Sequence, residues 1–240
     1  MLKNDRLIQS FKQMTPHYEA LVNRELQKFW GWNYWSFIDQ LIDTTPIFDH
    51  DAVLDVATGT ACIPRRLIEQ NRLVGSIVGL DITLEMLKSA KKQILAKGAS
   101  QSIKLACADA MVMPFRRNSF DVVICGLATH HIEVPTLLSE MRRVLKPGGS
   151  LTIADVGGSS LWQLPAIRSL LKISTFFYFM LTEGASRAWA EASALPNVKT
   201  AAQWQSYLEE IRFTNIHVSE LPKTHTWIPS PLLITAIKPT

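Results

Sequence analysis

The sequence predicts an α/β fold with a doubly wound, mostly parallel sheet. Apolar segments of strand length alternate with helical stretches along residues 52–155, and this alternation is typical of parallel sheets. The first strand-like segment, VLDV at 53–56, runs directly into the small-residue turn ATGTA at 57–61. Several segments also end on Asp or Gly, which indicates a ligand-binding edge of the sheet. The length of 240 residues and the hydrophobic content of 47% suit one domain with a full three-layer core.

Each element can be placed from the spacing of its apolar residues. Three helices are predicted before the sheet, at 5–13, 15–29 and 33–43, the second with a capped start at Thr15. The predicted strands lie at 52–57, 76–81, 102–107, 120–125 and 150–155, and the helices between them at 60–71, 83–97 and 135–145. We expect KPGG at 146–149 to end the last of these helices and to turn the chain into the fifth strand.

The alternation is lost after the fifth strand. Residues 157–197 form an apolar and aromatic stretch of helical character, which predicts a helical insert. A helix near 200–211 and two strands near 214–220 and 231–238 follow. The charges of the insert leave no uncharged stretch that is long enough to span a bilayer.

The residues at the strand ends suit a nucleoside ligand. The small residues at 57–61 let the backbone approach a ligand closely, and the helix that begins near Thr60 offers free N–H groups to a negative charge. Asp81 closes the second strand, where a carboxylate can accept from both ribose hydroxyls. Asp109 follows the third strand, where it can accept from an adenine amine. A helix-capping role for Asp81 and a turn-stabilising role for Asp109 stay open.

As a set, these motifs resemble the class I S-adenosylmethionine (SAM)-dependent methyltransferases. VLDVATGTA at 53–61 is similar to the first motif of that family, and GLDIT, ADAMVMPF, FDVVICGLATHHI and MRRVLKPGG follow in the family's order. The resemblance covers residues 48–156. Ala57 at the first glycine position and FKQMTPHYEAL at 11–21 are similar to the branch that methylates quinols on a ring carbon, whereas Ala61 stands where the family usually has glycine.

This resemblance implies a Rossmann-like, seven-stranded sheet whose last two strands form an antiparallel pair. It implies one methyltransferase domain over 1–240, with an N-terminal helical lid at 1–47, a SAM-binding core at 48–156, a helical insert at 157–199 that also forms a lid, and a closing helix and strands at 200–240. The cofactor is expected to be SAM. The residues expected to bind it are Asp55, Ala57, Gly59, Thr60, Asp81, Ile82, Asp109, Ala110, Met111, Gly126 and Tyr18.

Two histidines follow the fourth predicted strand. His130 and His131 lie just beyond Gly126, where a methyl acceptor and the sulfonium would meet, and a neutral imidazole can remove a proton from a hydroxyl or amine. Both are therefore candidate catalytic bases, while a structural role in capping the next helix stays open. Methyl transfer needs little acid or base help, because the sulfonium is already activated and in-line placement supplies most of the rate.

Aromatic residues concentrate in two segments that flank these motifs. They are Trp30, Trp32, Tyr34 and Trp35 before the first strand, and Phe176, Phe177, Tyr178, Phe179 and Met180 in the insert. Such segments suit the walls of a cavity for a flat or lipophilic molecule, unless they only pack helices against the core. We expect methyl transfer to a hydrophobic, aromatic or quinol-like small molecule by direct displacement. The alternatives are O- or N-methylation of a specialised metabolite, and SAM binding without turnover.

Charge, cysteines and glycine spacing disfavour other classes. The net charge is +4, but basic residues are scattered among acids, so nucleic acid is not an expected partner. Cys62, Cys107 and Cys125 lie in or beside apolar strands without C-x-x-C spacing, which predicts reduced core thiols, no metal site and a cytoplasmic location. A nicotinamide dehydrogenase would need glycines at 57, 59 and 62, of which only Gly59 is present. Peripheral membrane contact and the oligomeric state stay open.

Overall fold

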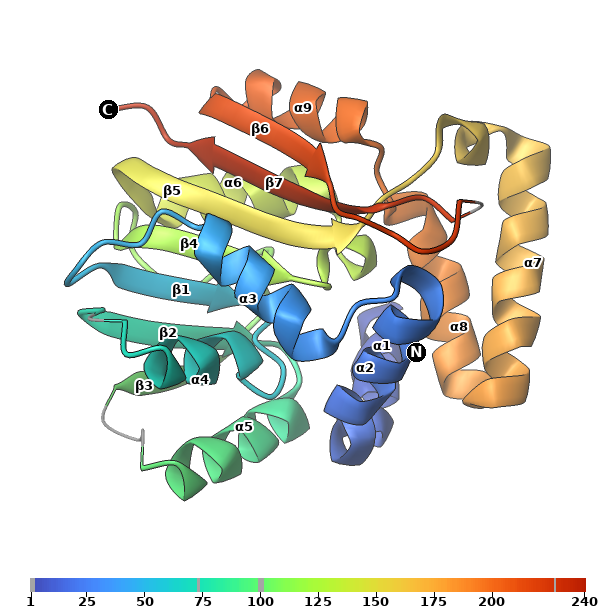
Figure 1. Ribbon diagram of the computed structural model, residues 1–240, viewed down its shortest axis with the longest axis horizontal. Helices are drawn as coiled ribbons and strands as arrows, with labels where there is room; N and C mark the ends of the chain where they lie inside the picture. The colour runs from blue at the N-terminus through green and yellow to red at the C-terminus, as the bar shows by residue number, and fades with distance from the viewer. Residues whose placement is uncertain (1–2, 73, 99–101, 227) are drawn as a thin grey trace.

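A seven-stranded sheet in the order β3-β2-β1-β4-β5-β7-β6 forms the centre of the computed structural model (Figure 1), which describes residues 3–72, 74–98, 102–226 and 228–240. The strands are β1 (Ala52–Val56), β2 (Ser76–Asp81), β3 (Ile103–Cys107), β4 (Phe120–Gly126), β5 (Leu145–Val156), β6 (Thr214–Glu220) and β7 (Pro231–Ile237). The first five strands pair in parallel, and β7 is antiparallel to both β5 and β6. The predicted doubly wound, Rossmann-like sheet with an antiparallel closing pair is confirmed.

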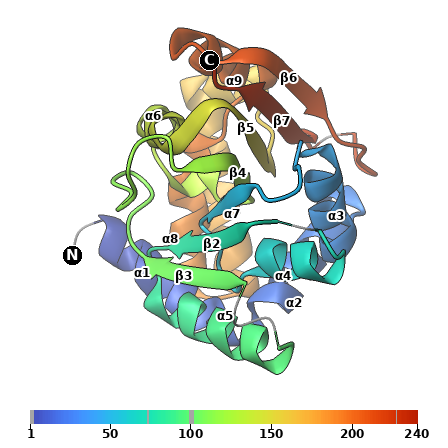
Figure 2. The same ribbon diagram turned by 90° about the vertical axis from the view of Figure 1, so that its left-hand side faces the viewer.

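Helices cover both faces of this sheet (Figure 2). They are α1 (Lys3–Met14), α2 (Tyr18–Trp30), α3 (Tyr34–Thr44), α4 (Cys62–Glu69), α5 (Leu84–Ala96), α6 (Val134–Val144), α7 (Pro165–Thr182), α8 (Ala185–Ala194) and α9 (Ala201–Glu210). Side chains of β4 alternate between the faces, because successive strand residues point to opposite sides. Ile124 joins the core under α3 to α5, and Val123 joins the core under α6 and α9. A strand buried on both faces explains the continuous apolar run VVIC at 122–125.

The predicted cap at Thr15 is wrong. The Thr15 hydroxyl donates to the Phe11 carbonyl at 2.9 Å, one turn back along the chain. The Thr15 side chain caps no helix start, because α1 continues into α2 through the 3₁₀ turn Thr15–His17, and no side-chain cap is present at the start of either the turn or α2.

The predicted role of KPGG is also wrong. The helix α6 ends at Val144, before this segment, and Leu145 is already extended. Leu145 pairs with Phe120 and Ser150 with Val122, so the residues between them form an irregularity within β5. Gly148 takes a φ of 78° there, a left-handed conformation that favours glycine. The irregularity in β5, and not the end of a helix, therefore explains this glycine.

Two of the three cysteines are core residues as predicted, and one is not. Cys62 and Cys125 are buried, whereas Cys107, the last residue of β3, is exposed; all three are free thiols. The strand β3 forms one edge of the sheet, which leaves its end uncovered.

The N-terminal and insert helices meet beyond the carboxyl ends of the parallel strands. Figure 1 shows α1 and α2 beside α8, with α7 outside them. Arg187 of α8 pairs with Glu25 of α2 at 2.9 Å, and Glu19 of α2 accepts from Arg65 of α4 at 2.7 Å. These ion pairs fix the helices over the edge at which the predicted site residues lie. Within the described part of the chain, no helix is long and apolar enough to cross a membrane.

Candidate functional site

Two neighbouring cavities lie at this edge of the sheet. The first has a volume of about 270 Å³ and the second of about 190 Å³. Phe11, Tyr18, Leu127 and His131 border both, so these four residues form the wall between them. Molecules bound in the two cavities would therefore approach each other at this wall.

Most of the predicted cofactor residues line the first cavity. They are Ala57, Gly59, Asp81, Ile82, Asp109, Ala110, Met111 and Tyr18. Three others do not line it: Asp55 and Thr60 are buried at 1% and 2% exposure, and Gly126 faces α3 and α4, where an added Cβ would lie 3.3 Å from the nearest side chains. The residues that follow β1, β2 and β3 thus lie together at one edge of the sheet, because the carboxyl ends of parallel strands meet there.

The turn after β1 has an unusual backbone. Ala57, Gly59 and Ala61 take φ values of 57°, 55° and 61°, in the left-handed region that larger side chains tolerate poorly. A Cβ at Gly59 would lie 3.5 Å from the Tyr18 ring, an ordinary contact, so the conformation rather than the space favours glycine there. Left-handed alanines cost of order 1–2 kcal/mol each, and such strain is typical of ligand-binding turns.

Asp81 links the turn after β1 to the start of α5 at the first cavity. Its Oδ2 accepts from the Gly59 N–H at 2.9 Å and its Oδ1 from the Thr83 N–H at 2.7 Å, beside the start of α5. Burial raises the pKa of Asp81, while these two N–H donors oppose the shift. The helix-start role is therefore present, yet a carboxylate has about four lone-pair sites, so Asp81 retains acceptor capacity toward the cavity.

Asp109 also has a local partner. Its Oδ1 accepts from the Met111 N–H at 2.8 Å, which stabilises the turn after β3. Asp109 nevertheless lines the first cavity, together with the apolar side chains of Ile82 and Met111. A flat apolar group with a polar edge would suit this arrangement.

Asp55 lies beneath the turn instead of in the cavity. Its Oδ2 accepts from the Thr58 hydroxyl at 2.5 Å, and its Oδ1 has no hydrogen-bond partner. Burial, with a smaller contribution from the Asp81 charge, raises the pKa of Asp55 to about 7. Its position indicates that it shapes the turn.

The second cavity is walled mainly by aromatic and apolar side chains. Trp30 and Phe179, both in the predicted aromatic segments, line it together with Phe29 and Trp162. The other aromatic residues predicted for this wall do not. Trp35 packs under the Arg65 guanidinium, 5.4 Å from its ring centroid, and Phe177 is 58% exposed.

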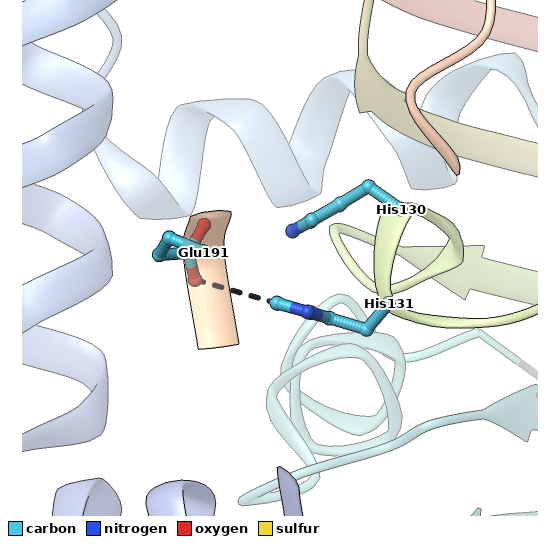
Figure 3. Close-up of side chains that lie close together, drawn as sticks. All are labelled: His130, His131 and Glu191. Carbon is cyan, nitrogen blue, oxygen red and sulfur yellow. Dashed lines mark ion pairs between the residues drawn. The ribbon is translucent and has the colours of Figure 1, made fainter. Parts of the chain in front are cut away.

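A cluster of charged and ionisable residues borders the second cavity; we call it the charged cluster. It consists of Glu25, His130, His131, Asp155, Arg187 and Glu191. His130 and His131 belong to the 3₁₀ turn Thr129–His131 after β4. Figure 3 shows both rings directed toward Glu191 of α8. His130 borders the second cavity only, and His131 borders both cavities.

Asp155, the penultimate residue of β5, fixes the histidine turn. Its Oδ1 lies 2.6 Å from His130 Nδ1 and its Oδ2 accepts from the His130 N–H at 3.0 Å. The Thr129 hydroxyl also donates to Asp155. Burial alone would lower the pKa of His130, but the Asp155 carboxylate outweighs it and the pKa is raised.

The other half of the cluster is built across helices. Arg187 Nη2 donates to both carboxylate oxygens of Glu25, at 2.9 and 3.1 Å. Glu191 Oε1 lies 3.0 Å from Arg187 Nη1 and 3.4 Å from His131 Nε2. Burial and the neighbouring His130 lower the pKa of His131. Burial would raise the pKa of Glu191, but Arg187 and His131 outweigh it and hold it low.

The sequence did not identify four members of this cluster. Asp155 ends the strand predicted at 150–155 on a carboxylate, the same signal that identified Asp81, and could have been found. Glu25, Arg187 and Glu191 carry no such signal, because they lie on helices and meet only through tertiary packing.

Comparisons with known proteins identify the family. Residues 54–153 match the family described as "Methyltransferase domain". The chain is 30% identical over 178 residues to the ubiquinone/menaquinone biosynthesis C-methyltransferase UbiE of Wigglesworthia glossinidia brevipalpis, covering 74% of this chain and 67% of that protein. It is 28% identical to the demethylmenaquinone methyltransferase of Bacillus velezensis, covering 89% and 91%. For two further relatives of that name, the chain spans only 54% and 58% of their length.

A solved structure shows the same fold. The YcgJ protein of Bacillus subtilis superposes with a TM-score of 0.66 at 18% identity, over 86% of this chain and all of that one (100%). At this identity the likeness concerns the fold alone.

Proposed function

Because this chain belongs to the family of SAM-dependent methyltransferases, we propose that it transfers the methyl group of SAM to a hydrophobic, aromatic or quinol-like small molecule by direct displacement. The observation that carries the proposal is the shared wall of the two cavities, where Tyr18 and His131 border both. A donor and an acceptor that meet at this shared border would be placed for direct transfer, and such placement supplies most of the rate.

SAM occupies the first cavity in this proposal. The turn at 57–60 receives the methionine part, Asp81 accepts from the ribose hydroxyls and Asp109 from the adenine amine. Ile82 and Met111 pack on the adenine faces. The acceptor capacity that Asp81 retains and the apolar side chains around Asp109 support these roles.

The acceptor occupies the second cavity, with its ring among Trp30, Trp162 and Phe179 and its polar group at the charged cluster. The imidazoles of the cluster can accept the proton of an acceptor hydroxyl, and the negative oxygen then directs electron density to the attacking atom. His130, oriented by Asp155, and His131, at the wall, are the proposed contacts of this hydroxyl. The names of the relatives favour C-methylation of a quinol, and O- or N-methylation is the alternative. The cytoplasmic location remains a prediction.

The test is mass spectrometry of a quinol incubated with the protein and deuteromethyl-SAM, with calorimetric titration of SAM in parallel. We expect one labelled methyl in the product. His130→Ala should lower the transfer rate about 10²–10⁴-fold with SAM affinity unchanged, and Asp81→Ala should weaken SAM binding by about 1.5–3 kcal/mol. The matched control is His217→Ala, an exposed histidine on β6. If the protein binds SAM but forms no labelled product from quinols, phenols or amines, it is a SAM-binding protein without turnover.

A further inference from the structure

Three potential metal ligands converge within the charged cluster. They belong to His130, His131 and Glu191, and one ligand atom from each lies within 4.8 Å of the other two. Figure 3 shows the three side chains facing a common point. His131 Nε2 and Glu191 Oε1 are 3.4 Å apart. Zinc–ligand bonds of about 2.0–2.1 Å put neighbouring ligands of a tetrahedron roughly 3.3 Å apart. We propose that His130, His131 and Glu191 bind one divalent transition-metal ion, with Zn²⁺ the best fit to this ligand set.

A carboxylate behind one ligand supports this assignment. His130 Nδ1 lies 2.6 Å from Asp155 Oδ1, so a neutral His130 carries its proton on Nδ1 and a free lone pair on Nε2. Metal-binding histidines usually donate their second ring N–H to a carboxylate in this way, because it fixes the ring and raises its basicity. Asp155 is itself held by the Val156 N–H at 2.7 Å.

The charges of the cluster provide an independent argument. Three largely buried carboxylates, Glu25, Asp155 and Glu191, face a single permanent cation, Arg187. Each carboxylate has a partner, but the permanent charges of the cluster do not balance, and unbalanced buried charge is unfavourable. A divalent cation would supply the missing positive charge while leaving both imidazoles neutral. Glu191 Oε1 also makes no hydrogen bond, although it is buried and lies within ion-pair distance of Arg187 and His131.

Arg187 is the group that opposes a cation at this place. Its guanidinium already donates to both oxygens of Glu25, and this bidentate pair neutralises its charge. Arg187 and His131 both approach Glu191 Oε1, at 3.0 and 3.4 Å, so the guanidinium and the metal would share this oxygen, which has two lone pairs. The remaining repulsion predicts moderate affinity.

The catalytic consequence rests on the proposed function. Three protein ligands leave a fourth position open to the second cavity, as in catalytic zinc sites. An acceptor hydroxyl bound there would lose its proton to water while the O–H electron pair stays on the metal-bound oxygen. The methyl group then passes from sulfur to the acceptor with the S–C electron pair left on sulfur. With an ion bound, His130 would hold the metal instead of contacting the acceptor hydroxyl, and the ion would supply the Lewis acidity that favours ionisation of that hydroxyl.

Metal titration without SAM or acceptor tests the inference. The full chain is treated with EDTA, exchanged into buffer and titrated with Zn²⁺ by calorimetry, and with Co²⁺ by visible absorption. We expect one ion per chain and a tetrahedral Co²⁺ spectrum. Binding should be lost in Glu191→Gln and His131→Ala and weakened about 10–100-fold in Asp155→Asn, with His217→Ala unchanged. Circular dichroism and thermal unfolding show whether each variant is folded.

The outcomes separate this inference from the proposed function. No stoichiometric uptake of Zn²⁺, or equal uptake by the wild type and a folded Glu191→Gln variant, overturns the metal site. Full methyl transfer by EDTA-treated, metal-free protein removes the catalytic consequence and leaves the proposed function intact. Stoichiometric Zn²⁺ binding that needs Glu191, without any methyl transfer, sustains the metal site and counts against the proposed function alone.

Discussion

Asp55 shows how one buried carboxyl group can couple stability to pH. Its pKa is raised by burial from 3.8 to about 7, and only one of its oxygens has a hydrogen-bond partner. In the unfolded chain the same group would lose its proton near pH 4. Between these values the folded state binds more protons than the unfolded state, so the free energy of unfolding falls as the pH rises.

We expect Asp55→Asn to remove this dependence. The difference between the two pKa values corresponds to on the order of 4 kcal/mol. Asparagine can still accept from the Thr58 hydroxyl but cannot ionise. The variant should therefore match the wild type near pH 4 and be more stable above pH 7, which urea unfolding at pH 4, 6 and 8 would measure. Parallel curves for the two proteins would contradict the assigned pKa.

Residues at strand ends were predictable, and residues that meet across helices were not. Asp81, Asp109 and the histidine pair were found because parallel strands end at a common edge. Arg187 and Glu25 are separated by 162 positions, and neither lies in a motif. Their ion pair depends on how the insert packs against the N-terminal helices, which no local spacing encodes.

At the scale of the elements, the helical character of the insert was predicted, but not which side of its helices faces the cavity. Its apolar composition gave helices, as observed in α7 and α8. The run FFYFM contains residues on opposite faces of α7, because neighbours in a helix are about 100° apart. Phe179 is 8% exposed and borders the second cavity, whereas Phe177 is 58% exposed. The inward face is set by α8 and α2, so the sequence could not distinguish these two residues.

These two phenylalanines form a matched pair for testing the acceptor wall. Phe179→Ala should lower the free energy of unfolding by about 3 kcal/mol and raise KM for the acceptor while SAM affinity is retained. Phe177→Ala should change stability by less than about 0.5 kcal/mol and leave KM unchanged. Denaturant unfolding and steady-state kinetics measure both. A larger effect on KM from Phe177→Ala would place the acceptor elsewhere.

At the scale of the whole molecule, the sheet and its helical cover are tied together by charge. Glu19 joins α2 to Arg65 of α4, and Glu25 joins it to Arg187 of α8. Both cavities therefore depend on segments more than a hundred residues apart in the chain. The lid function predicted for residues 1–47 and for the insert requires that this cover open to solvent.

We expect S-adenosylhomocysteine to slow amide hydrogen exchange in α1, since Leu7, Ile8 and Phe11 line the first cavity. Amides that exchange only when the cover opens and the ligand leaves should be protected roughly 100-fold at a ligand concentration 100 times Kd. The control is α9, which lines neither cavity and should exchange at an unchanged rate. Equal exchange of α1 with and without the ligand would mean that this helix does not enclose the cofactor.

The position of Phe11 and Tyr18 on both cavities has a kinetic consequence. One displacement of the segment that carries them would open the passage for the donor and the acceptor together. Entry of substrates and exit of products would then share a single gate, and the two products would leave in the same opening event. Where lid opening is slow, it sets the turnover rate in place of chemistry. The exchange experiment repeated with acceptor alone should accordingly slow the same amides of α1.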